Sequence, residues 1–449
     1  MSIRIIETGS PLTDRAVAAV RDRLRRGGLA DIRTGALSAQ KVTTAVREII
    51  ADVERRGDKA LIELTAKFDR VRLTAGELRV PAARIAAARA EADEPFMGII
   101  RRAIRNIRQY QRSILLKDPP AIRRGGRRLG VRYLSVDRVG VYVPGGRAFY
   151  PSTVVMTVVP AIVAGVREIA ICCPPTAGDD VHPMVLALAA ELGVKEVYRV
   201  GGAQAVAAMA VGTRTIRKVD KVVGPGNAFV AEAKRQLFGR VGIDSIAGPS
   251  EVLIVADGGA RPQWVAADML AQAEHDPGSA VLVTPSAKLA KDVAAAVDAQ
   301  IATMERAPAA RAAIEQFSAI IVVRDLDTAC DVANDFAPEH LQVIVRAAHE
   351  RRALARIRHA GAIFIGPHTP VPLGDYYAGP SHVLPTGGTA RFFSPLSCND
   401  FLKASSIVRY DASSLAADAA DVMAFARREG LTGHAAAVEV RMRGKARRM

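Results

Sequence analysis

The chain has 449 residues, of which 49% are apolar and 24% charged, and its formal net charge is +16. This length predicts two or more domains with separate cores, and the apolar share is typical of a globular enzyme. No apolar run reaches the roughly eighteen residues of a membrane span, and the opening MSIRIIETGSPLTDR lacks the order of a signal peptide. We therefore expect a cytoplasmic protein without a membrane partner.

The positive charge raises the question of nucleic-acid binding, which the rest of the sequence does not favour. Basic residues cluster at 101–108 on one expected helix, at 123–128 around a glycine pair, and in the tail 441–449. No aromatic residues interleave with these clusters, and no recognition motif is present. We expect solvated basic faces and no specific nucleic-acid partner.

Residues 13–113 are expected to be mainly helical. Apolar residues recur at spacings of three and four from Val42 to Phe68, and again from Arg84 to about Tyr110. Prolines at 119–120 and glycines at 125–126 then interrupt the pattern.

From Val139 the sequence alternates between short apolar strands and helices. Four strand–helix units fit between 139 and about 245, which predicts a parallel sheet with helices on its faces. Three of the strands end in glycine turns, at 144–146, 201–202 and 224–227. Ligands bind beyond the carboxyl ends of such strands, so dinucleotide binding is one interpretation. Simple turns are the alternative, because the Gly-x-Gly-x-x-Gly fingerprint is absent.

A second α/β portion follows, with strand patterns at 250–258, 279–286, 319–325 and 341–347, and a last strand at 361–366. Between the first two lies QWVAADMLAQAEHD, residues 263–276, which predicts a helix. Gln272 and His275 would lie on one face of it, one turn apart, where an amide oxygen and an imidazole could hold one metal ion. An ordinary solvated helix face is the alternative for such a pair.

Further candidate residues come from the loops. Glu339 and His340 follow Pro338, where a histidine could act as an acid or base and a carboxylate could orient a water, although an isolated pair of this kind is commonly a surface feature. The Gly- and Pro-rich segment 367–388 is long for a loop and offers Asp375 and His382. From about Phe401 we expect helices again, with Glu429 and His434 near a helix end.

Eight segments in this order resemble the histidinol dehydrogenase family: VGVYVPGG, VGGAQA, VVGPGN, AGPSE, QAEH, APEHL, GDY followed by SHVLPTGG, and EGLTGH. The resemblance covers nearly the whole chain. It implies the last two oxidations of histidine biosynthesis, from L-histidinol through L-histidinal to L-histidine, with two NAD and one zinc site.

We expect an α/β fold with two Rossmann-like parallel-sheet domains and helical extensions at both ends. The expected parts are an N-terminal helical extension, a metal and catalytic domain, an NAD-binding domain, and a C-terminal helical tail that contributes to the partner subunit's site. Their boundaries are, in that order, 1–30, 31–138 plus 247–395, 139–246, and 396–449.

The resemblance also implies roles for individual residues. The implied metal ligands are Gln272, His275, Asp375 and His434, and the implied catalytic pair is Glu339 and His340. Cofactor contacts are implied for Tyr142, Gln204 and Asn227. Substrate contacts are implied for Ser250, His382 and Glu429, together with the metal ligands and His340. Three features depart from the family pattern: Ser381 in place of Asn, Cys398 within a familiar segment, and the basic tail beyond Arg441.

In the implied mechanism His340 is the general base of both oxidations, and Glu339 activates the water that adds to the aldehyde. Zinc acts as a template for the substrate. A covalent role for Cys172 or Cys173 is rejected, because neither has a basic neighbour in sequence that would lower its thiol pKa. The family resemblance also implies a homodimer with shared sites, while a tail that folds back on its own subunit remains open.

Two other functions remain as alternatives. One is a paralogous NAD- and zinc-dependent dehydrogenase of another small alcohol. The other is a zinc hydrolase in which Glu339 activates water and the glycine-rich domain has only a structural role.

Overall fold

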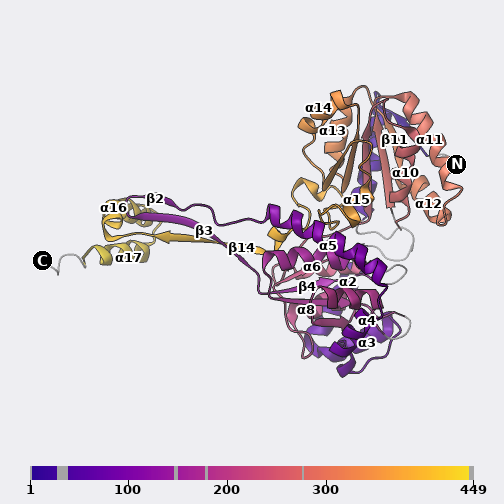
Figure 1. Cartoon of the computed structure of the whole chain (residues 1–449). Helices are drawn as coiled ribbons and strands as arrows, with labels where there is room; N and C mark the ends of the chain where they lie inside the picture. Colours follow the sequence, from indigo (N-terminus) through magenta and orange to yellow (C-terminus); the bar gives the residue numbers. More distant parts are fainter. Residues whose placement is uncertain (1–2, 28–38, 146–149, 177–179, 276–277, 444–449) are drawn as a thin grey trace. The chain divides into compact units, whose positions relative to one another are not determined.

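The computed structural model describes residues 3–27, 39–145, 150–176, 180–275 and 278–443. They belong to two compact units, Met1–Ile114 with Val136–Phe401, and Leu115–Ser135 with Leu402–Met449. The first unit contains two parallel sheets covered by helices (Figure 1). The second contains a small antiparallel sheet and two helices. The expected α/β fold with parallel sheets is confirmed.

The first parallel sheet has the strand order β6-β5-β4-β7-β8, and its neighbouring strands are all parallel. Its strands are β4 (Arg138–Tyr142), β5 (Glu168–Cys173), β6 (Glu196–Arg199), β7 (Lys221–Val223) and β8 (Gly242–Ile243). The helices between them are α6 (Pro151–Ala164), α7 (Pro183–Glu191), α8 (Gly202–Val211) and α9 (Ala228–Leu237). The alternation of strands and helices expected between 139 and 245 is therefore present.

Helices from the N-terminal part complete both faces of this sheet. Helices α2 (Ala39–Arg56) and α3 (Asp58–Phe68) share a core with α8 and α9, and α4 (Ala82–Ala90) and α5 (Glu94–Ile114) share the opposite core with α6 and α7. This packing differs from the expected grouping of residues 31–138 with 247–395. The physical reason is that α8 is rich in small buried alanines, against which the apolar stripe of α2, including Val46 and Val53, can pack closely.

The second parallel sheet has the order β1-β11-β10-β9-β12-β13. Its strands are β1 (Ile5–Glu7), β9 (Ser250–Ala256), β10 (Gly278–Thr284), β11 (Ala319–Val322), β12 (His340–Ile344) and β13 (Ala362–Ile365). Helices α10 (Pro262–Ala273), α11 (Ala287–Ile301) and α12 (Ala307–Phe317) pack on one face (Figure 1). Helices α1 (Pro11–Gly27), α13 (Leu326–Phe336) and α14 (Ala347–Arg356) pack on the other. The first residues thus add an edge strand to this sheet before the expected helix begins.

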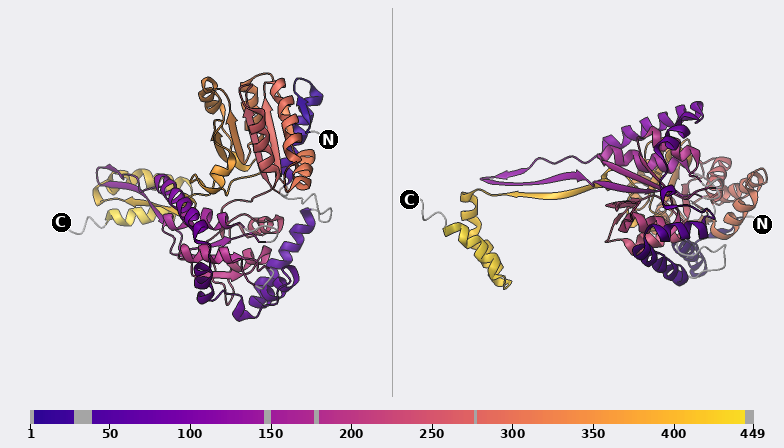
Figure 2. Two further views of the ribbon diagram at one scale, coloured as in Figure 1. Left: turned by 45° about the vertical axis from the view of Figure 1, so that its right-hand side comes forward. Right: turned by 90° about the horizontal axis from the view of Figure 1, so that it is seen from below.

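The second unit consists of strands in the antiparallel order β14-β3-β2 and two helices. Its elements are β2 (Ile122–Arg124), β3 (Arg127–Ser135), β14 (Leu402–Arg409), α16 (Ala412–Arg428) and α17 (Thr432–Arg443). Figure 2 shows β3 and β14 as two long strands side by side. The expectation that helices resume at once after Phe401 was wrong for 402–409. Nearly every residue of β14 is exposed, so the segment lacks the apolar alternation that marks a half-buried strand. The tail beyond Arg443 lies outside the described residues.

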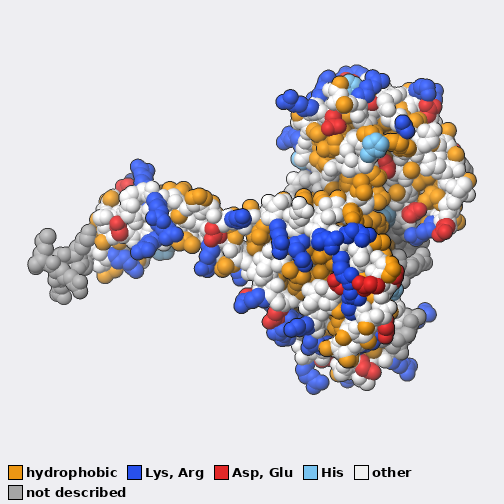
Figure 3. Space-filling view, in the orientation of Figure 1, with side chains coloured by type: hydrophobic (Ala, Val, Ile, Leu, Met, Phe, Trp, Pro, Cys, Tyr) orange, Lys and Arg blue, Asp and Glu red, His pale blue; other side chains and the backbone are white. Residues whose placement is uncertain are grey.

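The surface of the described chain is basic and largely solvated. Figure 3 shows Lys and Arg side chains over much of the visible face. On α5, Arg101 forms ion pairs with Glu94 and Glu191, and in the second unit Arg127 pairs with Asp418. Within the described ranges, no helix is long and apolar enough to cross a membrane.

Candidate active site

His340 is the first residue of β12, in register with Val252 of β9 and Ala362 of β13. Its Nδ1 lies 3.0 Å from the carbonyl oxygen of Glu251. A carbonyl can only accept a hydrogen bond, so Nδ1 carries the proton. The Nε2 atom is buried without a hydrogen-bond partner among the described residues, and lies 3.4 Å from Oδ1 of Asp375. The imidazole is therefore fixed on one side and free to accept a proton on the other.

The charges around His340 are mainly negative. Burial alone would lower its pKa, but the carboxylates of Glu339 and Asp375 outweigh burial and hold the pKa well above the usual value for histidine. Oε2 of Glu339 lies 3.4 Å from Nδ1 of His340. Glu339 and His340 are both about 95% buried, so these charges act with little screening by solvent.

Asp375 and His382 both come from the long segment after β13. Asp375 lies on a short helix, α15 (Val371–Tyr376), within the segment 367–388 that was expected to be a loop. The imidazole of His382 hydrogen-bonds to the backbone of Asp375, and the charges of Asp375 and Glu339 both act on that imidazole. Burial nevertheless lowers the pKa of His382, so this histidine is predominantly neutral. Asp375 and His382 from this segment thus lie close to the Glu339–His340 pair.

Gln272 and His275 lie at the end of α10, beside the start of β10. The helix ends at Ala273, so His275 follows it in a tight turn, where its N–H donates to the Gln272 carbonyl over 3.2 Å. Gly278 permits this approach, because a Cβ there would lie 2.1 Å from the same carbonyl. Gly278 is paired in register with Ser250, which brings Ser250 to the same edge.

His275 belongs to the same charged cluster. Its surface is accessible to solvent, yet protein surrounds it closely enough for desolvation to lower its pKa. Glu339 and Asp375 oppose this shift, which places both carboxylates near the ring. The structure thus brings together five of the expected residues: His275, Glu339, His340, Asp375 and His382.

These residues fit a metal site with mixed nitrogen and oxygen donors. The side chain of Gln272 is 4% exposed, and its Nε2 is buried without a partner in the described chain. A half-turn of the amide exchanges its nitrogen and oxygen, and would present an acceptor oxygen at this position. Neutral imidazole, carboxylate and amide oxygen are suitable zinc donors. Among the described residues, no group of three His, Cys, Asp or Glu side chains is placed to hold a metal. Of the expected ligands, only His275 and Asp375 are of these types and belong to the first unit.

Glu429 and His434 belong to the second unit. Glu429 caps the C-terminal end of α16, and His434 lies in the first turn of α17; both are exposed. Within the second unit, the structure therefore presents these two side chains to solvent.

The expected cofactor residues lie at the carboxyl edge of the first sheet. Tyr142 ends β4, and its hydroxyl accepts a hydrogen bond from the N–H of Gly202 over 3.2 Å. Gln204 is buried in the first turn of α8. The Oδ1 of Asn227 caps α9 by accepting from the N–H groups of Phe229 and Val230. The expected glycine turns meet at this edge, except that Gly146 lies outside the described residues.

A buried ion pair holds the turn that leads to Asn227. Nζ of Lys234 donates to Asp244 and to the carbonyl of Gly224, and Oδ2 of Asp244 accepts from the N–H of Gly224 over 2.7 Å. Gly224 has φ +114°, and a Cβ there would lie 2.1 Å from the Tyr142 carbonyl. The turn after β7 is thereby fixed against the end of β4.

Two acidic residues near these sites were not singled out from the sequence. Glu251 of the AGPSE segment exchanges hydrogen bonds with Glu339, and the quoted motif was the only signal for it. Asp69 follows α3, and burial raises its pKa to about 6. Its charge raises the pKa values of Tyr142 and Cys173, which places it near the carboxyl edge of the sheet. No pattern in the sequence pointed to Asp69.

The four cysteines are free and buried. Desolvation raises the pKa of the Cys172 and Cys173 thiols, which disfavours the thiolate that a covalent mechanism needs. Cys398 contacts Gln111, and Ser381 donates to the carbonyl of Met156 in α6. Both departures from the family pattern thus have packing partners.

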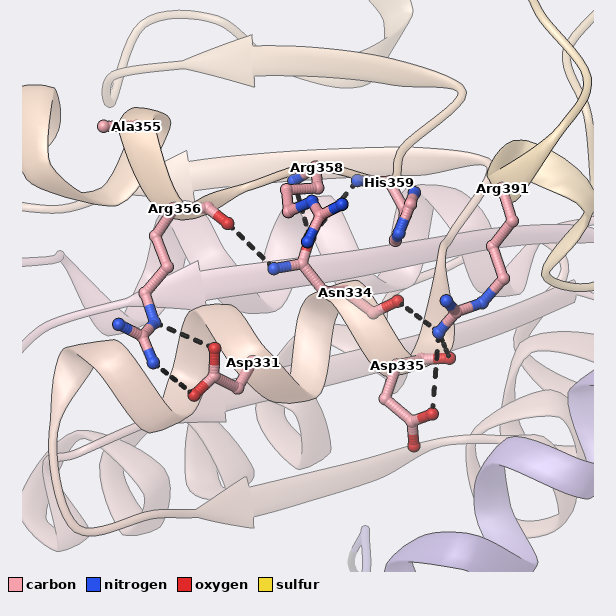
Figure 4. A pocket seen from close by; sticks show the side chains of 8 residues that line it. All are labelled: Asp331, Asn334, Asp335, Ala355, Arg356, Arg358, His359 and Arg391. Atoms are coloured by element: carbon pink, nitrogen blue, oxygen red, sulfur yellow. Dashed lines mark hydrogen bonds and ion pairs between the residues drawn. The ribbon is translucent and has the colours of Figure 1, made fainter.

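A surface hollow of about 570 Å³ lies at the end of α13 (Figure 4). Its charged groups bind one another: Arg356 pairs with Asp331, and Arg391 donates to the carbonyls of Asn334 and Asp335. No buried side-chain atom without a partner, among the described residues, belongs to its lining. These contacts therefore hold the end of α13, just before Glu339.

Comparisons with known proteins agree with the motifs. The family model described as histidinol dehydrogenase matches residues 32–442. A histidinol dehydrogenase from Rhodopirellula baltica is 47% identical over 450 residues, covering 98% of this chain and 97% of that protein. One from Geobacillus kaustophilus is 49% identical over 418 residues, covering 93% and 98%. The crystal structure of histidinol dehydrogenase from Elizabethkingia anophelis matches with a TM-score of 0.90 and 31% identity, covering 99% of both chains. The resemblance found in the sequence is confirmed, and the chain belongs to the histidinol dehydrogenase family.

Proposed function

We propose that the protein oxidises L-histidinol through L-histidinal to L-histidine, using two NAD and one zinc ion. Oxidation of histidinol in histidine biosynthesis is the reaction of its family. The observation that carries the detailed proposal is the buried Glu339–His340 pair, in which Nε2 of His340 has no hydrogen-bond partner among the described residues and points towards Asp375. His340 can act as a base at Nε2, and it lies next to the carboxyl group of Glu339 and a set of metal donors. This arrangement suits oxidation of an alcohol followed by hydration of the aldehyde.

The proposed ligands of zinc are Gln272, His275, Asp375 and His434. Zinc bound there would supply a positive charge that fixes the substrate and offsets the charge of Asp375 beside His340. Tyr142, Gln204 and Asn227 would contact NAD at the carboxyl edge of the first sheet, and NAD accepts one hydride in each oxidation.

The residues of the chain would manage the protons and the water. In the first oxidation His340 accepts the alcohol proton at Nε2. Glu339 then accepts a proton from a water that adds to the aldehyde, while the proton held on His340 passes to the aldehyde oxygen. The neutral His340 can then deprotonate the resulting diol in the second oxidation. Ser250, His382 and Glu429 would hold the substrate, and retention of the aldehyde in a buried site would prevent its loss.

We further propose that the active form is a cytoplasmic homodimer, in which Glu429 and His434 complete the partner's site. The second unit supports this, because it exposes many of its apolar side chains. Phe425 is 70% exposed, Ile122 and Val408 are each 68% exposed, and Val440 is 61% exposed. Exposed apolar surface of this density is typical of a unit covered by a partner, and an isologous two-fold contact would cover both copies.

The proposed domain roles follow the same division. The sheet of β4–β8 would bind NAD, the sheet of β9–β13 would carry the catalytic pair and most metal ligands, and the tail would serve the partner. One assay tests the function: purified protein with NAD and histidinol should produce NADH absorbance. A zinc hydrolase would give none, and a paralogue would give more with another small alcohol than with histidinol.

A further inference from the structure

Glu251 is joined to the Glu339–His340 pair by three hydrogen bonds. Its backbone N–H donates to Oε2 of Glu339 over 2.8 Å, and its own Oε1 accepts from the Glu339 N–H over 3.3 Å. Its carbonyl accepts from Nδ1 of His340 over 3.0 Å. Glu251 and Glu339 are each 5% exposed, so each of these bonds is made away from solvent. One residue of β9 therefore contacts both members of the pair at the start of β12.

The carboxyl group of Glu251 also connects the pair to another segment. The same Oε1 accepts from the N–H of Gly387 over 2.8 Å. One residue earlier, Oγ1 of Thr386 accepts from the N–H of Gly248, so the loop after His382 is attached twice to the segment that leads into β9. Loss of the Glu251 side chain would leave the N–H groups of Glu339 and Gly387 without this acceptor.

Two buried carboxyl groups cannot both carry a charge without cost. Burial and the charge of Glu339 raise the pKa of Glu251 to about 7, and the N–H groups of Gly387 and Glu339 and the charge of His340 oppose this shift. The ionisation of Glu251 near neutral pH therefore changes the field in which Glu339 works.

We propose that Glu251 is a positioning residue for the hydration step: its carboxyl group fixes the backbone of Glu339 and the loop after His382, and its charge acts on Glu339 when that residue accepts a proton. The inference rests on the proposed role of Glu339. It goes beyond that role, because Glu251 acts through Glu339 and need not touch the substrate.

Two substitutions separate the hydrogen bonds from the charge. Glu251→Gln keeps an acceptor oxygen for the two N–H groups and removes the ionisable group, whereas Glu251→Leu removes both. Histidinal supplied directly isolates the second oxidation, and NADH formed from histidinol in a single turnover reports the first. Glu232→Gln is the matched control, because Glu232 is also buried but bonds to Arg235 and Gln236 on α9.

Glu251→Leu should lower histidinal oxidation on the order of 10²-fold, the cost of a misplacement of about 1 Å, and histidinol oxidation much less. Glu251→Gln should recover most of the rate on histidinal, and an inflection near pH 7 in the wild-type rate profile should be absent from it. Glu232→Gln should change neither the ratio of the two rates nor the profile. Circular dichroism and thermal unfolding of each variant identify any variant that fails to fold. If Glu251→Leu does not fold, the measurements on Glu251→Gln test the proposal.

Equal loss of both oxidations in the folded Glu251→Leu protein would overturn the inference, as would an unchanged pH profile in Glu251→Gln. Glu339→Gln, assayed in parallel, separates this failure from that of the proposed function. If Glu339→Gln oxidises histidinal normally, the role of Glu339 is wrong. If Glu339→Gln is impaired and the Glu251 variants behave like Glu232→Gln, only the inference about Glu251 is wrong.

Discussion

Nδ1 of His340 donates a hydrogen bond to the carbonyl oxygen of Glu251 over 3.0 Å. Because a backbone carbonyl cannot donate, this contact selects one tautomer and leaves the lone pair of the neutral ring on Nε2. The contact comes from the parallel pairing of β9 and β12, which is part of the core of the second sheet. The orientation of the proposed base is therefore maintained by the fold and does not require bound substrate.

The first prediction is that substitutions of the catalytic pair impair different steps. His340→Ala should lower both oxidations on the order of 10²–10⁴-fold, because it removes the base of each. Glu339→Gln should retain histidinol oxidation and lose most histidinal oxidation, because the amide cannot accept a proton from water. Rates of NADH formation from each substrate give the comparison.

His349→Ala is a suitable control for the histidine substitution. His349 lies on α14, where its Nδ1 is 2.9 Å from Oδ2 of Asp257, and both oxidations should remain near the wild-type rate. An equal loss of the two oxidations in Glu339→Gln would refute the division of roles.

The second prediction concerns metal removal. Chelation should abolish activity while the first unit stays folded, because the unit that carries Gln272, His275 and Asp375 has its own extensive apolar cores. Activity should return on addition of zinc, and circular dichroism should change little throughout. Unfolding of the metal-free protein near room temperature would show that the metal is structural. Full activity with no metal remaining would exclude a metal role.

The third prediction is complementation between two inactive variants. If His434 serves the partner's site, a heterodimer of His340→Ala and His434→Ala subunits contains one site with both defects and one with none. Random pairing after reversible dissociation should then restore roughly a quarter of wild-type activity.

Each parent variant, dissociated and reassociated alone, provides the baseline for this experiment. If the tail served its own subunit, every site in the mixture would keep one defect, and mixing would restore nothing. Size-exclusion chromatography of the mixture establishes that dimers have formed before the rates are compared.

The fourth prediction concerns the dependence of stability on pH. Glu251 has a pKa of about 7 in the folded protein, above the ordinary value for a glutamate, so the folded state binds its proton more tightly than the unfolded chain does. Its contribution is fully present below the ordinary pKa and is lost as pH rises through about 7. Denaturant unfolding at pH 5 and pH 8 should therefore show a fall in stability for wild type that is smaller in Glu251→Gln. An equal fall in both proteins would mean that other groups account for it.

Much of the fold could be predicted because its signals are local. The strands between 139 and 245 alternate with helices of regular apolar period, and Gly201, Gly202 and Gly224 mark their ends. The position of α2–α5 could not be predicted, because an apolar stripe indicates that a helix is buried but not which sheet covers it. Strand β14 was missed because its side chains are mostly exposed.

The site was predicted less from spacing than from the family motifs. Gln272 and His275 were expected one turn apart on a helix, yet the helix ends at Ala273 and Gly278 allows the turn that holds them together. The proximity of His340 to Asp375 depends on the path of the chain from 340 to 375, which no local pattern encodes. Glu251 was missed because its partners lie on β12 and in the loop after His382, both distant in sequence.

The central claim is that one site performs two successive oxidations of the same substrate, and the yield of NADH tests it most directly. A limiting, known amount of histidinol is added to the protein with excess NAD, and the NADH absorbance is followed to completion while the products are identified. The account predicts about two NADH for each histidinol, with histidine as the product and no accumulation of histidinal. A yield of one NADH with free histidinal, or no NADH at all, would contradict it.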